Sequence, residues 1–485
     1  MTRHVSRRAL MQAAVAAGAG INLTSILTGC AIAGERSVRG SEAAAPEALR
    51  RWVEAEAARW RIPGLAAVVA KEGHPLATFL LGKASVPFDV SVAEHTRFHI
   101  ASIAKHITAM AVMRLVEAGS VRLDAPLGEF LDGLPAGWGE RPIRSLLTHT
   151  SGIPDYEDMI VWDRPYTRES FLEMASSRPL DFEPGEGWFY SNTAYVLLGW
   201  LIQAVSGRSH ARFIEEELLQ RAGLQDSRVD DADAVIENRA EPYEWRDQEL
   251  RHAVRMNGRL SGWTDGGILM SARDIAPWDA AINGDKLVRS QTRTAIFTPV
   301  RLNTGRSIPY GFGWSVDANP GGRSFHWHAG SVPGFTSFYF RVPQEGLAVA
   351  VLTNIGGRSR PQRFIAMSLA EHFVPGCSPL GLEPIPDRSP ELTAAAREIL
   401  FRGPKPLDPE MFAPELAVLV HGRLGNGAVI NLGGDAARLR DIVVVQEEET
   451  SSQRVRRYRL EYGDHREHVS FGYAPDGRIY FVRLL

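Results

Sequence analysis

Strand-like segments stand at both ends of residues 45–374, and a long helix-rich stretch separates them. Short apolar or alternating runs bounded by turn residues predict strands over 64–70, 75–81, 325–329, 335–342 and 347–353. From residue 102 to about 223 the apolar spacing is helical instead. Two sets of strands that are far apart in the chain are both buried if they join one sheet. The pattern therefore predicts an α/β (α+β) domain with an antiparallel sheet built from its N- and C-terminal strands, flanked by helices, with an all-helical insertion.

The last hundred residues predict a second, smaller domain. Residues 375–386 are rich in Pro and Gly and are expected to form a linker. Beyond it, Ser389-Pro390-Glu391 is typical of a helix start, and Asp476-Gly477 lies between two strand-like runs as in a hairpin. We expect residues 387–485 to form a small α+β domain, to which no functional motif can be assigned.

The first 44 residues have the composition of an export segment and a tether. Ser6-Arg7-Arg8-Ala9-Leu10-Met11 resembles a twin-arginine signal and precedes a weakly apolar run, so residues 1–29 predict a signal peptide. Leu27-Thr28-Gly29-Cys30 resembles a lipoprotein processing site, where Cys30 would be lipidated. The alternative is a plain signal peptide followed by an incidental cysteine. Residues 30–44 are then a flexible tether, and the protein is expected to be an exported, periplasmic or cell-envelope lipoprotein held to a membrane.

Charge and motif content exclude several classes of function. The formal net charge is -3 and no basic cluster is present, so nucleic acid is a poor candidate partner. The two cysteines do not have metal-site spacing, and no Gly-rich phosphate loop occurs. We expect no cofactor and no metal, and a small-molecule or peptide substrate. The sequence does not indicate an oligomeric state.

A serine and a lysine one helical turn apart are the first candidate for chemistry. Ser102 and Lys105 begin a helical pattern that ends near Gly119, so both side chains are expected on one face. A lysine near the positive end of a helix dipole is disfavoured as an ammonium and could take a proton from the serine hydroxyl. The alternative is an N-capping serine followed by a surface lysine. The chain has only five lysines, which makes this spacing an uncommon coincidence.

Tyr190 and Asn192 form a second candidate pair. They lie two residues apart, directly before a predicted helix over 193–205, so both side chains can face one wall of a cleft. A phenol beside a cation can relay protons, and an amide can hold Lys105 and a substrate amide together. The alternative is a buried aromatic residue followed by an N-cap.

The third candidate lies on the predicted strand that carries His326-Trp327-His328-Ala329-Gly330-Ser331. Alternation places His326 and His328 on one face, which raises a metal site, but no further ligands with suitable spacing complete it. Gly330 is expected to let a substrate backbone approach the strand closely, and the N–H of Ser331 can point into the cleft.

Together these three motifs resemble those of the serine penicillin-recognising family, which comprises class C-like β-lactamases, D-peptidases and related esterases. Two further stretches are similar to that family, 146–152 (LLTHTSG) and 310–314 (YGFGW). The resemblance spans about residues 45–374 and implies a β-lactamase-like fold that needs no cofactor.

The resemblance also implies roles for the site residues. Ser102 would attack a carbonyl, Lys105 and Tyr190 would move its proton, and Asn192 would orient Lys105 and the substrate. Backbone N–H groups of Ser102 and Ser331 would form an oxyanion hole, and His328 would line the pocket beside Gly330. His149 is implied to be structural, in a turn below the cleft.

His328 stands where β-lactamases usually carry lysine, and a mostly neutral imidazole is less suited to a substrate carboxylate. The leading hypothesis is therefore a serine hydrolase that forms an acyl-enzyme on Ser102 and hydrolyses an ester or an amide or peptide of D-amino-acid type. One alternative is a class C-like β-lactamase. Another is a non-catalytic sensor that binds penicillin or peptidoglycan fragments.

Overall fold

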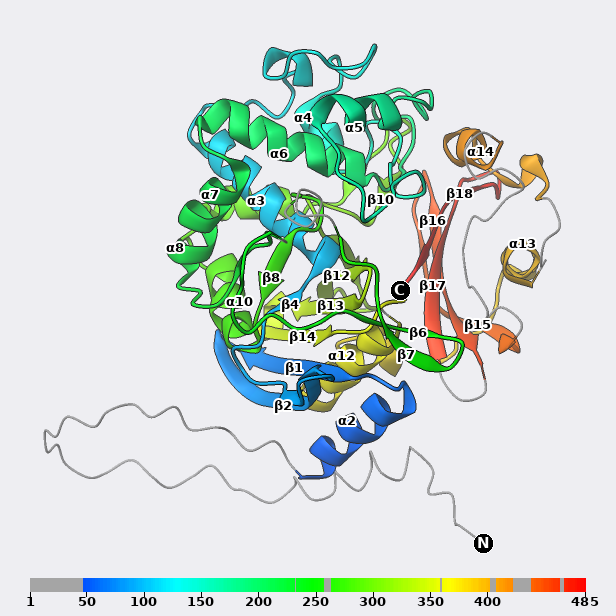
Figure 1. The fold of residues 1–485 in the computed structure, drawn as a ribbon. Coiled ribbons are helices and arrows are strands. Elements are labelled where there is room, and N and C mark those ends of the chain that lie inside the picture. The colour runs from blue at the N-terminus through cyan, green and yellow to red at the C-terminus, as the bar shows by residue number, and fades with distance from the viewer. Residues whose placement is uncertain are drawn as a thin grey trace, which may run out of the picture.

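The fold is described from a computed structural model (Figure 1). It describes residues 47–231, 233–256, 263–357, 360–401, 407–421, 438–462 and 466–485. The predicted signal, Cys30 and the tether lie outside these residues. Within the described part of the chain, no helix is long and apolar enough to cross a membrane.

One seven-stranded sheet joins the two ends of the larger domain, in the order β11-β12-β13-β14-β1-β2-β3. Its strands are β1 (Gly64–Lys71), β2 (His74–Ser85), β3 (Val90–Ser91), β11 (Ser315–Ala318), β12 (Ser324–Val332), β13 (Phe335–Val342) and β14 (Leu347–Thr353). The early strand β1 pairs antiparallel with the late strand β14, with Val68 opposite Ala350. The prediction of one sheet built from both ends is therefore confirmed.

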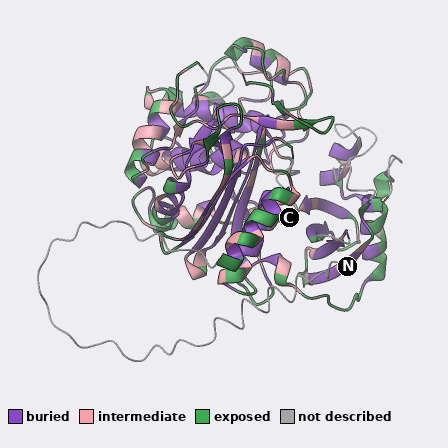
Figure 2. Cartoon of the chain, turned by 60° about the horizontal axis from the view of Figure 1, so that its bottom comes forward, coloured by how far each residue is buried: buried purple, intermediate pink, exposed green. Residues whose placement is uncertain are grey.

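The sheet is covered by helices on both faces, which is why its central strands β13, β14 and β1 are buried along almost their whole length. Along β1, Leu65 and Val69 pack against α2 (Glu47–Arg59) and α12 (Arg360–Phe373). Ala66 and Val68 face the opposite core. Figure 2 shows these strands buried along their length while the covering helices keep exposed outer faces.

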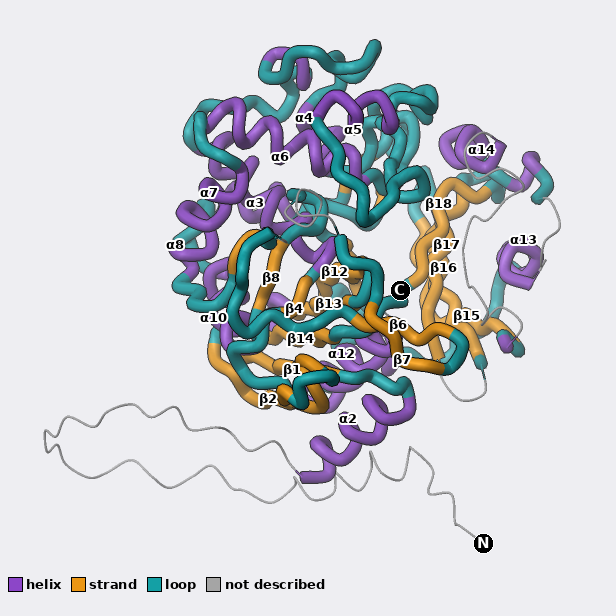
Figure 3. Tube along the Cα trace, in the orientation of Figure 1, coloured by secondary structure: helices purple, strands orange, loops and turns teal. Residues whose placement is uncertain are grey.

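The opposite core is formed largely by the helical insertion, above the sheet in Figures 1 and 3. Its helices are α3 (Ala104–Glu117), α4 (Ile143–Leu147), α5 (Arg168–Ala175), α6 (Asn192–Ser206), α7 (His210–Ile214), α8 (Gln220–Ala222), α10 (Ile275–Asn283) and α11 (Ser290–Ile296). Shorter strands accompany them: β4 (Phe98–His99), β5 (Arg228–Val229), β6 (Tyr243–Arg246), β7 (Glu249–His252), β8 (Ile268–Met270), β9 (Val300–Arg301) and β10 (Ser307–Ile308).

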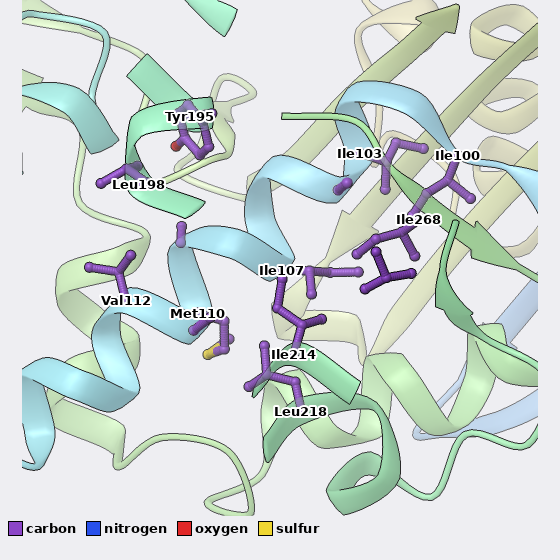
Figure 4. Packing of buried hydrophobic residues seen from close by; sticks show 14 of the residues in the cluster. Ile100, Ile103, Ile107, Met110, Val112, Tyr195, Leu198, Ile214, Leu218 and Ile268 are labelled. Carbon is purple, nitrogen blue, oxygen red and sulfur yellow. The ribbon is translucent and has the colours of Figure 1, made fainter. Parts of the chain in front are cut away.

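Helix α3 lies at the centre of that core. Eleven of its fourteen residues are buried, so α3 is surrounded by other parts of the protein around most of its circumference rather than along one stripe. Figure 4 shows Ile107 and Met110 close to Ile214 and Leu218, which come from the segment after α6. This packing fixes the start of α3, where Lys105 lies directly after the turn that carries Ser102.

In the C-terminal region, the described residues form a four-stranded antiparallel sheet and two helices. Its elements are α13 (Pro390–Phe401), α14 (Pro414–His421), β15 (Asp441–Glu449), β16 (Arg454–Glu461), β17 (Arg466–Tyr473) and β18 (Ile479–Leu484). Apolar residues of both helices and all four strands form one core, as expected for a small α+β unit. Contacts from β16 and β18 to Asp317 at the end of β11 join it to the larger domain.

Candidate active site

Ser102 sits in a single 3-10 turn, η1 (Ala101–Ile103), that leads directly into α3. Ala101 has a positive φ of 51°, which is unusual for a residue with a side chain. A buried hydrogen bond holds this turn in place: Ser337 Oγ donates to the carbonyl of Ile100 at 2.8 Å. The serine hydroxyl is thus presented at the start of a rigid helix.

Lys105 is fully buried, and its ammonium nitrogen touches three oxygens. Nζ lies 3.2 Å from Ser102 Oγ, 2.6 Å from Asn192 Oδ1 and 2.7 Å from the carbonyl oxygen of Asp265. Burial lowers the pKa of Lys105 to about 8, against the opposing effect of nearby carboxylates. The largest cause of this lowering is loss of solvation, and not the helix dipole that the sequence suggests.

Three carboxylates lie near Lys105 and favour its charged form, which opposes the effect of burial on its pKa. Asp265, Asp155 and Glu157 each raise the pKa of Lys105. Asp265 is itself buried, and its Oδ2 accepts a 2.6 Å hydrogen bond from the Tyr156 hydroxyl. Burial raises the pKa of both Asp265 and Glu157. Two opposing effects therefore set the pKa of Lys105: burial lowers it, and the acidic neighbours raise it.

Tyr190 lies beside the serine–lysine pair. Its hydroxyl is hydrogen-bonded to Ser102, and its ring centroid is 4.9 Å from Lys105 Nζ. Burial holds the pKa of Tyr190 well above its usual range, so the phenol is protonated at neutral pH. Ser102 is therefore in contact with both a titratable amine and a neutral phenol.

Asn192 is the first residue of α6, and the side-chain cap of that helix is Ser191, whose hydroxyl accepts from Ala194 N–H. The alternative that Asn192 is the N-cap is therefore wrong. Its Oδ1 faces Lys105, while its Nδ2 donates to Asp155 at 3.3 Å and to Glu157 at 3.1 Å. Both Nδ2 hydrogens therefore have partners within the protein. These carboxylate contacts fix the side chain of Asn192, whose Oδ1 then positions Lys105.

His328 is held neutral at one end of a directional hydrogen-bond chain. Ser191 N–H donates to His149 Nδ1 at 3.1 Å, so the neutral His149 carries its proton on Nε2, which lies 3.1 Å from the Tyr310 hydroxyl. Tyr310 in turn lies 3.2 Å from His328 Nε2, and His328 Nδ1 lies 2.7 Å from the carbonyl of Ala329. Burial lowers the pKa of His149 far below its usual value and that of His328 to about 3.

Close packing within the protein requires a glycine at position 330. A Cβ on Gly330 would lie 2.2 Å from the carbonyl oxygen of Ile100 and 2.3 Å from Ser337 Oγ. Strand β12 is therefore packed directly against the turn that carries Ser102, a contact that the sequence does not predict. The neighbouring Ser331 lines the cleft, and its hydroxyl donates to the carbonyl of Gly357 at 2.6 Å.

The stretch YGFGW (310–314) is explained by the same kind of contact. Gly313 has a φ of 73°, and a Cβ there would lie 2.8 Å from the backbone of Lys105 and His106. This segment therefore packs against the first turn of α3 and places the Tyr310 hydroxyl between His149 and His328. The stretch 146–152 (LLTHTSG) contains His149, which is buried in a turn as expected.

Ser102, Tyr190, His328, Gly330 and Ser331 line one open cleft of about 300 Å³. The other described residues that line it are Glu157, Trp188, Tyr310, Ser315, Trp327, Ala329 and Arg483. The three sequence motifs thus meet at one site. Arg483, from β18 of the C-terminal domain, reaches the same cleft.

No cluster of three potential metal ligands occurs among the residues that the structure describes. The ring of His326 stacks on Phe297 at 4.2 Å between centroids, in the core beside Trp314. The chemistry available in the cleft is that of a hydroxyl, an amine and a phenol in mutual contact, which suits nucleophilic attack on a carbonyl.

Sequence reasoning missed the acidic residues and the arginine. Asp155 and Glu157 follow the LLTHTSG stretch closely, so that motif was the available signal for them. Asp265 and Arg483 lie in stretches without any motif. Only the three-dimensional packing brings these two residues to the site.

Comparisons with known proteins agree with this geometry. The family model described as Beta-lactamase matches residues 49–372. The chain is 30% identical over 329 residues to Penicillin-binding protein 4* of Bacillus subtilis, which covers 64% of this chain and 72% of that protein. It is 25% identical over 332 residues to a D-aminopeptidase of Brucella anthropi, covering 67% of this chain and 62% of that protein. The chain thus spans less than two thirds of the D-aminopeptidase's length.

A solved structure extends the likeness in fold to the C-terminal domain. The octameric penicillin-binding protein homologue from Pyrococcus abyssi aligns with a TM-score of 0.59 at 23% identity, covering 90% of this chain and 98% of that one. At this identity the likeness concerns the fold alone. Because the family model covers most of the chain and the motifs meet in one cleft, the protein belongs to the beta-lactamase family of serine hydrolases.

Proposed function

We propose that this serine hydrolase forms an acyl-enzyme on Ser102 and hydrolyses an amide or peptide of D-amino-acid type, or a related ester. The observation that carries the proposal is the buried Lys105 Nζ at 3.2 Å from Ser102 Oγ. With a pKa of about 8, about a tenth of Lys105 is neutral at pH 7 and can accept a proton. The likeness to D-aminopeptidases favours a D-amide over other acyl donors.

The proposed reaction has two halves. Ser102 Oγ attacks the substrate carbonyl carbon while its proton passes to Lys105 Nζ, and the backbone N–H groups of Ser102 and Ser331 bind the oxyanion. When the bond to the leaving group breaks, the Tyr190 hydroxyl protonates the departing nitrogen or oxygen and regains a proton from Lys105. Water then attacks the ester carbonyl on Ser102 and gives a proton to the same pair. The bond between the acyl carbon and Ser102 Oγ breaks, Oγ takes that proton back, and the acid is released.

His328 bears on the choice between D-amide hydrolysis and β-lactamase activity. As a neutral imidazole it does not supply the permanent cation that lysine supplies in β-lactamases. This favours an amidase, a peptidase or an esterase. A sensor that only binds has no use for a lysine with a lowered pKa beside a serine.

The test is covalent labelling followed by turnover. Wild-type protein is expected to react with a fluorophosphonate probe and to hydrolyse a D-alanyl p-nitroanilide, and Ser102→Ala is expected to lose both reactions. Ser315→Ala is the matched control, because it removes another hydroxyl from the cleft lining at a residue with no role in the proposed reaction. Labelling of Ser102→Ala at the wild-type level would contradict the proposal.

Two other results would redirect the assignment. Nitrocefin hydrolysis faster than D-amide hydrolysis would favour the β-lactamase alternative. Inert results across a panel of D-amides and esters would favour the non-catalytic sensor. We further propose that residues 1–44 export the protein and tether it through Cys30, which mass spectrometry of the membrane-bound form can test.

A further inference from the structure

Tyr190 directly follows a loop, residues 182–189, whose aromatic side chains pack into the C-terminal domain. Phe182 is buried in the apolar core that α13, α14 and the four strands form, and Phe189 packs against the same core. Trp188 packs against a second apolar cluster, which includes side chains of β18. The two residues before Tyr190 are thus in contact with a domain that supplies no group to the reaction proposed above.

The larger domain holds the backbone on both sides of Tyr190. The N–H of Phe189 donates to the carbonyl of His149 at 3.0 Å, and the N–H of Ser191 donates to the ring of the same histidine at 3.1 Å. Neighbouring side chains in extended backbone point to opposite sides. Here Phe189 enters the C-terminal core, whereas Tyr190 lines the cleft. The packing of Phe189 and the orientation of Tyr190 are therefore coupled through a single peptide unit.

The start of α14 contacts the same loop. A Cβ on Gly187 would lie 3.0 Å from the carbonyl oxygen of Glu415, so the loop and the helix are closely packed. The buried carboxylate of Glu415 pairs with Arg306, in the turn between β9 and β10. In that turn, the N–H of Asn303 donates to the carbonyl of Gly185 at 2.8 Å. A buried ion pair thus gives the C-terminal domain a second connection to the loop before Tyr190.

The place of the Tyr190 hydroxyl decides whether it can give a proton to a leaving group. It is hydrogen-bonded to Ser102, and its raised pKa keeps it protonated at neutral pH. Proton transfer needs heavy atoms within hydrogen-bond distance, and a misplacement of about 1 Å can cost about 100-fold in rate. Ser102 and Lys105 are held in η1 and α3, within the larger domain. Loss of the Phe189 anchor should therefore misplace the phenol and leave the nucleophile and the lysine in place.

We propose that the C-terminal domain positions Tyr190, and that Phe189 is the positioning residue through which its packing reaches the site. This inference rests on the proposed function, in which the Tyr190 hydroxyl protonates the leaving group. The domain then acts on one step, the departure of a leaving group that needs a proton. A defect in the anchor should therefore depend on the leaving group of the substrate.

The experiment compares two substrates that share an acyl group, D-alanyl p-nitroanilide and the D-alanyl p-nitrophenyl ester, assayed with the full chain. The anilide nitrogen must be protonated as it leaves, whereas p-nitrophenolate is stable as an anion. Phe189→Ala is expected to lower kcat/KM for the anilide by about 10- to 100-fold and to keep that for the ester within about threefold of wild type. Phe189→Leu, which keeps a large apolar side chain in the core, should recover most of the loss.

Two further variants separate positioning from general loss of stability. Ile399→Ala is the matched control, because it removes apolar volume from the same core but from α13, which lies outside the loop. It should lower the melting temperature and leave the ratio of the two rates unchanged. Tyr190→Phe removes the hydroxyl itself, so adding Phe189→Ala to it should cause no further loss on the anilide.

The inference is overturned if Phe189→Ala lowers both rates equally or neither, if Ile399→Ala changes their ratio as much, or if Phe189→Ala lowers the anilide rate further in Tyr190→Phe. If Phe189→Ala does not fold, Arg306→Gln takes its place, because it breaks the pair with Glu415 and leaves the apolar core intact. A folded Arg306→Gln protein should show a smaller loss that is again confined to the anilide, and an unchanged ratio would overturn the inference.

Failure of the proposed function looks different from failure of this inference. Wild-type protein that neither reacts with fluorophosphonate nor hydrolyses either substrate contradicts both. Wild-type protein that is labelled on Ser102 and hydrolyses both substrates, while Phe189→Ala keeps the wild-type ratio, contradicts only the role of the C-terminal domain.

Discussion

Two buried clusters of charged side chains border the same cleft. Carboxylates outnumber the cation in one, and cations outnumber the carboxylate in the other. Around Lys105, one ammonium is influenced by three carboxylates. Around Asp317, one carboxylate contacts two guanidiniums, those of Arg457 and Arg483. The first cluster lies within the larger domain, whereas the second joins that domain to the C-terminal domain.

The two clusters also differ in whether their cations can lose a proton near neutral pH. A buried lysine changes its protonation state near neutral pH, so its carboxylates can tune a proton acceptor. Arginine does not lose its proton in a protein, so the Asp317 cluster can supply only fixed charge and structure. We infer that proton transfer is confined to the Lys105 cluster, and the following substitutions test that division.

The largest effect is expected for Lys105→Arg, which keeps the charge but removes the ability to lose a proton. We expect kcat/KM for an ester or D-amide to fall by about 10²- to 10⁴-fold, the usual contribution of a general base. Stopped-flow acylation by a chromogenic ester measures it. Lys286→Arg, at an exposed position, is the control. Near-wild-type acylation by a folded Lys105→Arg protein would show that the lysine does not take the proton.

Because arginine is larger than the buried lysine, Lys105→Met is a second variant of similar volume. It should lose acylation to the same extent. Circular dichroism and the melting temperature of each variant separate lost chemistry from lost folding.

A smaller effect, on stability instead of chemistry, is expected for Asp317→Asn. This change leaves two buried guanidiniums without a counter-charge, and breaking a buried ion pair in this way costs about 3 to 5 kcal/mol. Urea unfolding followed by tryptophan fluorescence measures the free energy of unfolding. Asp476→Asn, which breaks an exposed pair with Arg478, should cost under about 1 kcal/mol. Equal losses for the two variants would mean that Asp317 is not a structural centre.

The sequence predicted the parts of the fold and site that follow local patterns. Alternating and continuous apolar runs gave β1 and β14, and the Ser102–Lys105 spacing indicated a shared helix face that the structure has. These features depend on neighbours within a few residues, which is what periodicity records.

The remaining features depend on contacts between distant segments. Gly330 is required by the carbonyl of Ile100, some 230 positions earlier in the chain, and nothing near Gly330 indicates that contact. Arg483 looks like any polar residue of an alternating strand until the C-terminal domain packs against Asp317. A buried charge is recognised only once its partners are known, so neither the acidic neighbours of Lys105 nor the guanidinium cluster could be predicted.

The smallest effect is expected for Glu157→Gln, which tests the tuning of Lys105 directly. Acylation should increase as the pH rises through about 8, because the neutral amine is the form that accepts a proton. Glu157 raises the pKa of Lys105, so removing its charge should lower that pKa and shift the pH profile of kcat/KM toward lower pH by a fraction of a unit. Glutamine can still accept the hydrogen bond from Asn192 Nδ2, so the geometry is kept. Asp158→Asn is the control in the same loop, since Asp158 pairs with Arg178 and should leave the profile unchanged. A shift toward higher pH in Glu157→Gln would show that the carboxylate acts on another group.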